Sequence, residues 1–167
     1  MNLLTAIGLG SAPLATPVPN YGPSCLIFHF VWAYGVLSSR TLKQYFGIDH
    51  NVSPREDLNK YGEAAVREGK LTQAQLAMLR RNEAAHANAV ENFALLVAAI
   101  SLATFSGVPR TTINRAALTY TFARVSYGFI YIFVDRPLLS QLRGVTWWIG
   151  NLSCLTLLWK AGNLLSG

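Results

Sequence analysis

The chain has 167 residues, of which 51% are hydrophobic and 13% are charged, about half of the roughly 25% charged residues in an average soluble domain. This composition points to a membrane protein. Apolar runs near spanning length recur along the chain, which argues against a soluble all-helical domain with a large core. The two cysteines, Cys25 and Cys154, provide neither a disulfide framework nor metal-ligand spacing, and we interpret both as packing residues.

The first segment, up to about Pro23, contains four prolines and no charged side chain. A secretory signal normally has a basic n-region, so we expect an uncleaved, loosely ordered lead-in. The first predicted span covers residues 24–45 and ends in Arg40 and Lys43. His29 lies within it, and packing is the simpler interpretation than metal binding, since no second ligand lies at a helical spacing.

Residues 46–72 are polar and mixed in charge, and they are interrupted by Pro54, Gly62 and Gly69. We expect a solvent loop with a short helix in its middle, because the segment is too short to bury a core of its own. Thr72 to Gln75 form a plausible helix cap before the next span.

The second predicted span, residues 75–106, contains the stretch RRNEAAHANAVENFALLVAAISLATFS, around which we expect the molecule to be organised. At about 100° per residue, its polar side chains fall in one sector, with His86 nearly opposite. Glu91 lies within reach of a long apolar run, where a carboxylate needs a partner or a function. The residues of the sector are Arg81, Asn88, Glu91 and Asn92.

The third predicted span, residues 112–134, has a second polar sector. An arginine halfway along a span usually faces the bundle interior and pairs with a carboxylate, and Glu91 is the only acid inside an apolar run. We therefore expect Arg124 and Glu91 to pair, either structurally or as part of a functional site. The residues of this sector are Tyr120, Arg124, Tyr127, Tyr131 and Asp135.

The fourth predicted span, residues 145–165, has tryptophans near both ends, as interface anchors would be placed. Ten Lys and Arg side chains fall at the first and third connections and two at the second. This asymmetry predicts a cytosolic loop at 46–72 and termini in the lumen or outside. Most of the net charge of +6 is then a topology signal, and because no nucleic-acid-binding motif is present we expect no nucleic-acid partner.

Three motifs follow in order on the last three spans: AHANAVENF, ARVSYGFIY and LRGVTWW. With these motifs the chain resembles the MAPEG family, the membrane-associated proteins of eicosanoid and glutathione metabolism, over residues 40–159. The loop ending in EGKLTQAQL resembles fungal-type members. The resemblance implies a single domain over residues 1–167, an all-α integral membrane four-helix bundle that forms a homotrimer in the endoplasmic reticulum. It also implies glutathione as co-substrate, bound between subunits, and a lipophilic electrophile that arrives from the bilayer.

The family's functional positions carry over by motif. In such members an arginine lowers the pKa of the glutathione thiol, while tyrosines and a carboxylate hold the tripeptide, which makes Arg143, Tyr127 and Glu91 the candidate catalytic residues. No metal is implied. The candidate glutathione-binding residues are Arg40, Asn88, Glu91, Arg124, Tyr127, Tyr131 and Arg143, and Arg40 matches a basic position that ends the first span.

The chain also departs from the family pattern. Ala84 and Ala87 replace basic residues, Ala94 replaces a usual proline, and Gly144 stands where the prostaglandin-synthase branch has a serine. Each lost guanidinium removes a charge-assisted contact of about 1.5–3 kcal/mol. Three functions remain open: a glutathione transferase or peroxidase, a glutathione-independent isomerase or cyclase that uses the intramembrane acid, arginine and tyrosines, and a non-catalytic membrane scaffold.

Overall fold

The computed structural model describes residues 3–10 and 17–167. All regular structure in this part of the chain is helical, which confirms the predicted all-α class. The helical elements outnumber the four that we predicted, because the first span is divided and short helices occupy the connections. In chain order they are α1 (Leu3–Ala6), α2 (Gly22–Val31), the π-helical turn η1 (Trp32–Val36), α3 (Ser39–Tyr45), α4 (Asp57–Arg67), α5 (Gln73–Phe105), α6 (Arg110–Phe133), α7 (Pro137–Ser140) and α8 (Leu142–Ser166).

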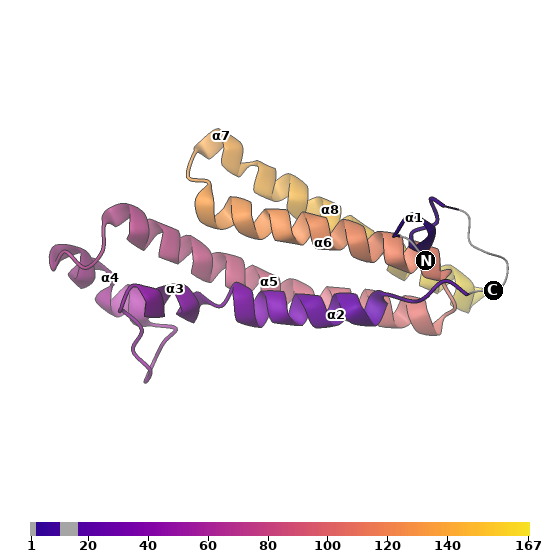
Figure 1. The fold of residues 1–167 in the computed structure, drawn as a ribbon, viewed down its shortest axis with the longest axis horizontal. Coiled ribbons are helices and arrows are strands. Elements are labelled where there is room, and N and C mark those ends of the chain that lie inside the picture. Colours follow the sequence, from indigo (N-terminus) through magenta and orange to yellow (C-terminus); the bar gives the residue numbers. More distant parts are fainter. Residues whose placement is uncertain (1–2, 11–16) are drawn as a thin grey trace.

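The long helix α5 is the central element, and it packs against α2, α6 and α8. The molecule is elongated, with α3, α4 and α7 at one end and α1 and the chain termini at the other (Figure 1). We call these the loop end and the terminal end.

Local sequence signals set the limits of α5. Thr72 accepts a hydrogen bond from the Gln75 backbone N–H at 3.1 Å, and the Gln75 side chain accepts one from the Thr72 N–H at 2.7 Å. This capping box confirms the predicted cap. The helix stops before Gly107, whose φ of +82° suits glycine, and Pro109 then caps the start of α6.

The first span is not the continuous helix that the sequence predicts. It changes to a π turn at Trp32–Val36 and breaks before α3. Two α5 side chains, four residues apart and therefore on one face, bind carbonyl groups at this irregularity. His86 Nδ1 lies 2.9 Å from the carbonyl oxygen of Ala33, and Asn82 Nδ2 donates to that of Leu37 at 3.3 Å.

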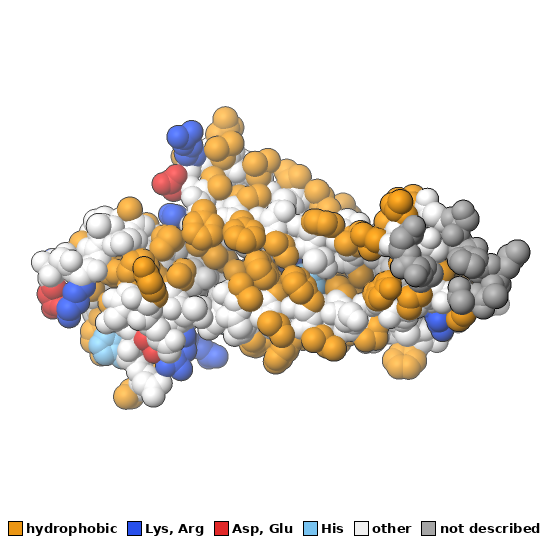
Figure 2. Space-filling model, in the orientation of Figure 1, with side chains coloured by type: hydrophobic (Ala, Val, Ile, Leu, Met, Phe, Trp, Pro, Cys, Tyr) orange, Lys and Arg blue, Asp and Glu red, His pale blue; other side chains and the backbone are white. Residues whose placement is uncertain are grey.

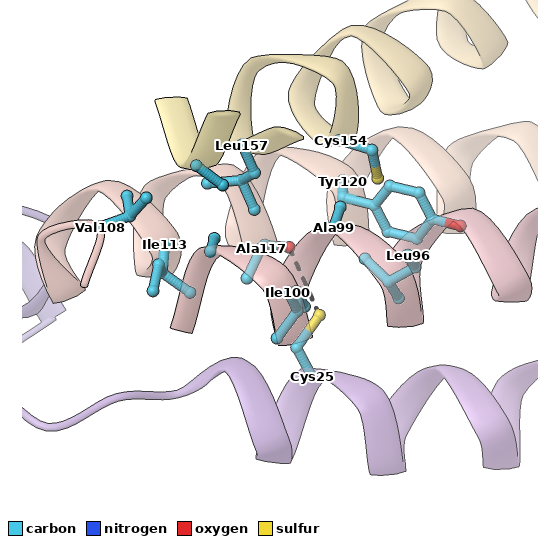
Figure 3. Close-up of a cluster of buried hydrophobic side chains, with 12 residues drawn as sticks. Cys25, Leu96, Ala99, Ile100, Val108, Ile113, Ala117, Tyr120, Cys154 and Leu157 are labelled. Carbon is cyan, nitrogen blue, oxygen red and sulfur yellow. Dashed lines mark hydrogen bonds between the residues drawn. The ribbon is translucent and has the colours of Figure 1, made fainter. Parts of the chain in front are cut away.

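The main core lies between α2, α5, α6 and α8, toward the terminal end (Figure 3). Leu96, Ile100 and Leu157 form its aliphatic part, and Tyr120 lies among them. Cys25 and Cys154 are buried in the same cluster and neither forms a disulfide, which confirms that both are packing residues.

The predicted short helix in the 46–72 segment is present as α4. The segment is more than a solvent loop, however, because it buries a second cluster against the first turns of α5. The cluster contains Ile48, Leu58, Ala65, Leu71, Leu76 and Leu79. The sequence analysis treated the segment as polar and did not consider that its apolar side chains could pack against the following helix.

The N-terminal segment is anchored on α6. Asn114 Nδ2 donates to the carbonyl oxygens of Ala6 at 2.8 Å and Pro19 at 2.9 Å, and the Tyr21 N–H donates to Asn114 Oδ1 at 2.8 Å. Arg115 binds the carbonyl oxygen of Ile7. The predicted loose lead-in is therefore wrong for residues 3–10 and 17–23, while residues 1–2 and 11–16 lie outside the described part.

Among the described residues, the stretches Gly22–Tyr45 and Gln73–Phe105 are long and apolar enough to cross a membrane. Figure 2 shows apolar side chains over the middle of the molecule, and charged side chains gather mainly toward its loop end. The predicted third and fourth spans coincide with α6 and α8, and their crossing of the bilayer stays a prediction.

Candidate functional site

Arg124, in the middle of α6, is the central charge of the candidate site. Its side chain is buried, with only 3% exposed. The Nη2 atom donates to Asn88 Oδ1 at 2.7 Å and to the Asn88 carbonyl oxygen at 3.2 Å. A side chain at Gly150 of α8 would place its Cβ 3.1 Å from Arg124 Cδ, so the missing side chain there makes room for the arginine.

The aromatic positions of α6 connect Arg124 to the start of α8. The Arg124 guanidinium carbon lies 4.4 Å from the centre of the Tyr127 ring, and the rings of Tyr127 and Tyr131 lie 5.4 Å apart, edge to face. The Arg143 guanidinium carbon lies 4.4 Å from the centre of the Tyr131 ring. Both arginines are at distances typical of cation–π contacts. We call this row of five residues, from Asn88 through Arg124, Tyr127 and Tyr131 to Arg143, the ladder.

Within the ladder, burial decreases from Arg124 to Arg143. Arg124 and Tyr127 are buried, whereas Tyr131 and Arg143 are partly exposed. Arg143 Nε donates to the Ser140 carbonyl oxygen at 3.1 Å, which fixes the plane of the guanidinium group near the loop end. The ladder thus carries positive charge from the interior to an accessible edge.

The predicted pair of Arg124 with Glu91 is wrong. Asn88, one helical turn before Glu91 on α5, provides both oxygens that bind Arg124 Nη2. Glu91 is exposed and lines a groove. The buried guanidinium donates its hydrogen bonds to neutral amide and carbonyl oxygens, so the Glu91 carboxylate stays available for another contact.

This groove, of about 650 Å³, lies at the loop end between the η1–α3 region and α5. It includes Arg40 and Glu91, the two candidate residues that are not in the ladder, and Tyr34, Glu83 and His86. The candidate residues therefore fall into two groups on one protomer, five in the ladder and two in the groove.

Arg40 is already partnered within the protomer. Its Nε and Nη2 atoms donate to Asp49 at 3.1 and 2.7 Å, and Nη2 also donates to Asn51 Oδ1 at 2.8 Å. The Arg40 guanidinium lowers the pKa of the Asp49 carboxyl group below its ordinary value by hydrogen bonding. Most of the donor capacity of Arg40 is therefore used to hold the 47–56 segment.

The sequence analysis missed an ion pair between a buried lysine and a carboxylate of the groove. Lys43 is fully buried, and its Nζ atom lies 3.0 Å from Glu83 Oε1 and binds the Pro54 carbonyl oxygen. Glu83 was visible in the organising stretch, but nothing in the sequence places it beside residues 43 and 54.

His86 has a second role that the sequence did not reveal. A carbonyl oxygen only accepts hydrogen bonds, so the contact with Ala33 assigns the proton to His86 Nδ1. In the neutral imidazole the Nε2 atom is then the proton acceptor, on a residue that lines the groove.

Comparison with known proteins gives a clear family result. The model of the MAPEG family matches residues 23–163, most of the chain, whereas no curated protein and no solved structure matches. The match covers α2 to α8, and with the two apolar helices it identifies a membrane protein. The resemblance noted from the three motifs is confirmed, and the chain belongs to the MAPEG family.

Proposed function

We propose that this protein is a membrane-embedded enzyme that joins the thiolate of glutathione to a lipophilic electrophile, as microsomal glutathione transferases of its family do. The ladder carries the proposal, because two guanidinium groups and two phenol rings converge along one face of α6. Such a row fits a ligand with carboxylates and an ionisable thiol.

The chemistry of the ladder residues fits glutathione. The tripeptide supplies a thiol with an ordinary pKa near 8.5, and the thiolate is the nucleophile. Arg143 is partly exposed and donates Nε to Ser140, which leaves its Nη groups to face a ligand. A guanidinium in this position stabilises negative charge on sulfur, and Tyr131 beneath it holds its orientation.

The division of the candidate residues supports a site shared between subunits. Glu91 in the groove suits the glutathione ammonium group, while the ladder suits carboxylates and thiolate. In a homotrimer, the groove of one protomer would face the ladder of the next and complete the set. We place this assembly in the endoplasmic reticulum with the loop end in the cytosol, as the distribution of Lys and Arg predicts.

Isothermal calorimetry with glutathione at millimolar concentration tests binding, and ultraviolet absorbance tests thiolate formation. Arg143→Ala should abolish the thiolate signal and the conjugation of lipophilic electrophiles while the protein stays folded. Arg143→Lys should fail as well, because an ammonium lacks the planar fork. Arg136→Ala, at an exposed arginine directly before α7, is the matched control and should keep full activity. Full turnover in Arg143→Lys would refute the catalytic role of Arg143.

A second function, a glutathione-independent isomerase, is favoured by the groove. His86 Nε2 is a proton acceptor there, Glu91 lies five residues further along α5, and Ala87 leaves space where relatives carry a basic residue. These groups suit proton transfer on a hydrophobic metabolite. Turnover without glutathione that depends on His86 and Glu91, and not on Arg143, would establish this function instead.

A further inference from the structure

A second groove, of about 460 Å³, runs between α6 and α8 and contains none of the candidate catalytic residues. Its rim, toward the terminal end, is formed by Arg115 and Lys160. Its floor extends along α8 to Ile149, eleven residues from Lys160, which corresponds to about 16 Å of helix. The groove is thus cationic at one end and runs along the axis of α8.

The floor of the groove is less polar than its composition suggests. Ser153 Oγ donates to the Gly150 carbonyl oxygen at 2.7 Å, and Thr156 Oγ1 donates to that of Leu152 at 2.7 Å. Because both hydroxyl protons are bonded to the helix that carries them, they do not call for a polar ligand. Together with Ile149 and Leu152, the floor suits a hydrocarbon chain.

The rim has an excess of positive charge that no carboxylate side chain of the protein balances. All eight acidic side chains lie between residues 49 and 91 or at Asp135, so none belongs to the last part of α5, to α6 or to α8. Arg115 binds the Ile7 carbonyl oxygen through Nε and Nη2, which fixes the group, and its Nη1 has no hydrogen-bond partner among the described residues. Lys160 forms no ion pair within residues 3–10 and 17–167, and it lies beside the exposed Trp159, an interfacial anchor.

We propose that this groove binds one anionic phospholipid from the leaflet at the terminal end, with the phosphate between Arg115 and Lys160 and an acyl chain along α8. The arrangement matches the charge and the shape of such a lipid, cationic where the headgroup lies and apolar below it. A zwitterionic lipid fits less well, because its ammonium group meets no acidic side chain there.

Native mass spectrometry of the full chain in detergent, titrated with phosphatidylglycerol or with phosphatidylcholine of the same acyl chains, tests the proposal. One phosphatidylglycerol per protomer should bind several times more tightly than phosphatidylcholine. Lys160→Gln should weaken phosphatidylglycerol about fivefold and leave phosphatidylcholine unchanged. Arg110→Gln is the matched control, since it removes the same charge at the same end of the molecule. Arg110 lies outside the groove and donates to the Val18 carbonyl oxygen.

Equal affinity for the two lipids, or an equal loss in Arg110→Gln and Lys160→Gln, would overturn the proposal. Thr119→Trp, which fills the groove from an exposed position on α6, gives a second arm. Loss of bound phosphatidylglycerol with an unchanged oligomer supports the lipid site. Dissociation of the oligomer would show instead that a second copy of the chain covers the groove.

Discussion

Asn88, and not Glu91, should control the stability of the buried Arg124. Asn88→Ala removes the side-chain oxygen at 2.7 Å from the guanidinium of Arg124, a residue that is 3% exposed, and leaves the weaker backbone contact at 3.2 Å. A hydrogen bond to a charged group is worth about 1.5–3 kcal/mol. For a chain of this size each kcal/mol shifts the melting temperature by about 2–4 °C, so we expect a decrease of about 3–12 °C.

The assay is thermal denaturation of the detergent-solubilised protein, followed by tryptophan fluorescence. Glu91→Gln should change the midpoint by less than about 1 °C, because Glu91 is exposed and forms no hydrogen bond or ion pair with the residues that the structure describes. Asn88→Asp should keep the stability, since it retains an oxygen acceptor and adds a counter-charge. In an Arg124→Met background the effect of Asn88→Ala should largely vanish. If Glu91→Gln destabilises the protein as much as Asn88→Ala, the guanidinium has the carboxylate as its partner and our assignment is wrong.

Three further outcomes are expected. Gly144→Ser should cause no loss of stability, because outside its own helical turn no heavy atom of the described residues lies within 4 Å of the added Cβ. On the transferase function it should raise turnover, measured by conjugation rate. Glu83→Gln should lower the free energy of unfolding by about 2 kcal/mol, measured by denaturant titration in detergent, and by more than Lys43→Met does. The reason is that the Lys43 ammonium is buried, while the Glu83 side chain is 30% exposed. A larger loss in Lys43→Met would contradict this. The contact of Asp49 with Arg40 should stabilise the fold above about pH 3.8, the ordinary pKa of Asp49, and should be lost as pH falls through the lowered folded-state pKa. Amide hydrogen exchange in residues 47–56 should then become faster at low pH. In Asp49→Asn the exchange should not increase further as the pH falls.

Local signals in the sequence were sufficient for much of the fold. The Thr72 to Gln75 cap and the Gly107 stop define α5 almost to the residue, because both act within a single turn. The spacing of Arg124, Tyr127 and Tyr131 likewise fixes one face of α6, and the structure brings these three together. Helical periodicity is a property of one segment, so it needs no knowledge of its neighbours.

Pairing between helices was beyond the sequence. Asn88 and Glu91 are three residues apart, about 60° around the helix, so helical periodicity places both in one polar sector. The rotation of α6 against α5 decides which of them meets Arg124, and that rotation depends on the packing of all three long helices. The burial of Lys43 is similar, because it depends on Pro54 and on Glu83, forty residues away.

The π turn at Trp32–Val36 packs against α5, the helix that also contributes to both groups of site residues. It leaves Tyr34 and Arg40 in the wall of the groove. The opposite wall is α5, and the same helix holds the irregular turn through His86 and the following break through Asn82. Further along, α5 binds Arg124 of the ladder through Asn88. One helix therefore fixes the position of the groove and of the ladder together. A shift of α5 by one turn would move Glu91 away from the groove and Asn88 away from Arg124.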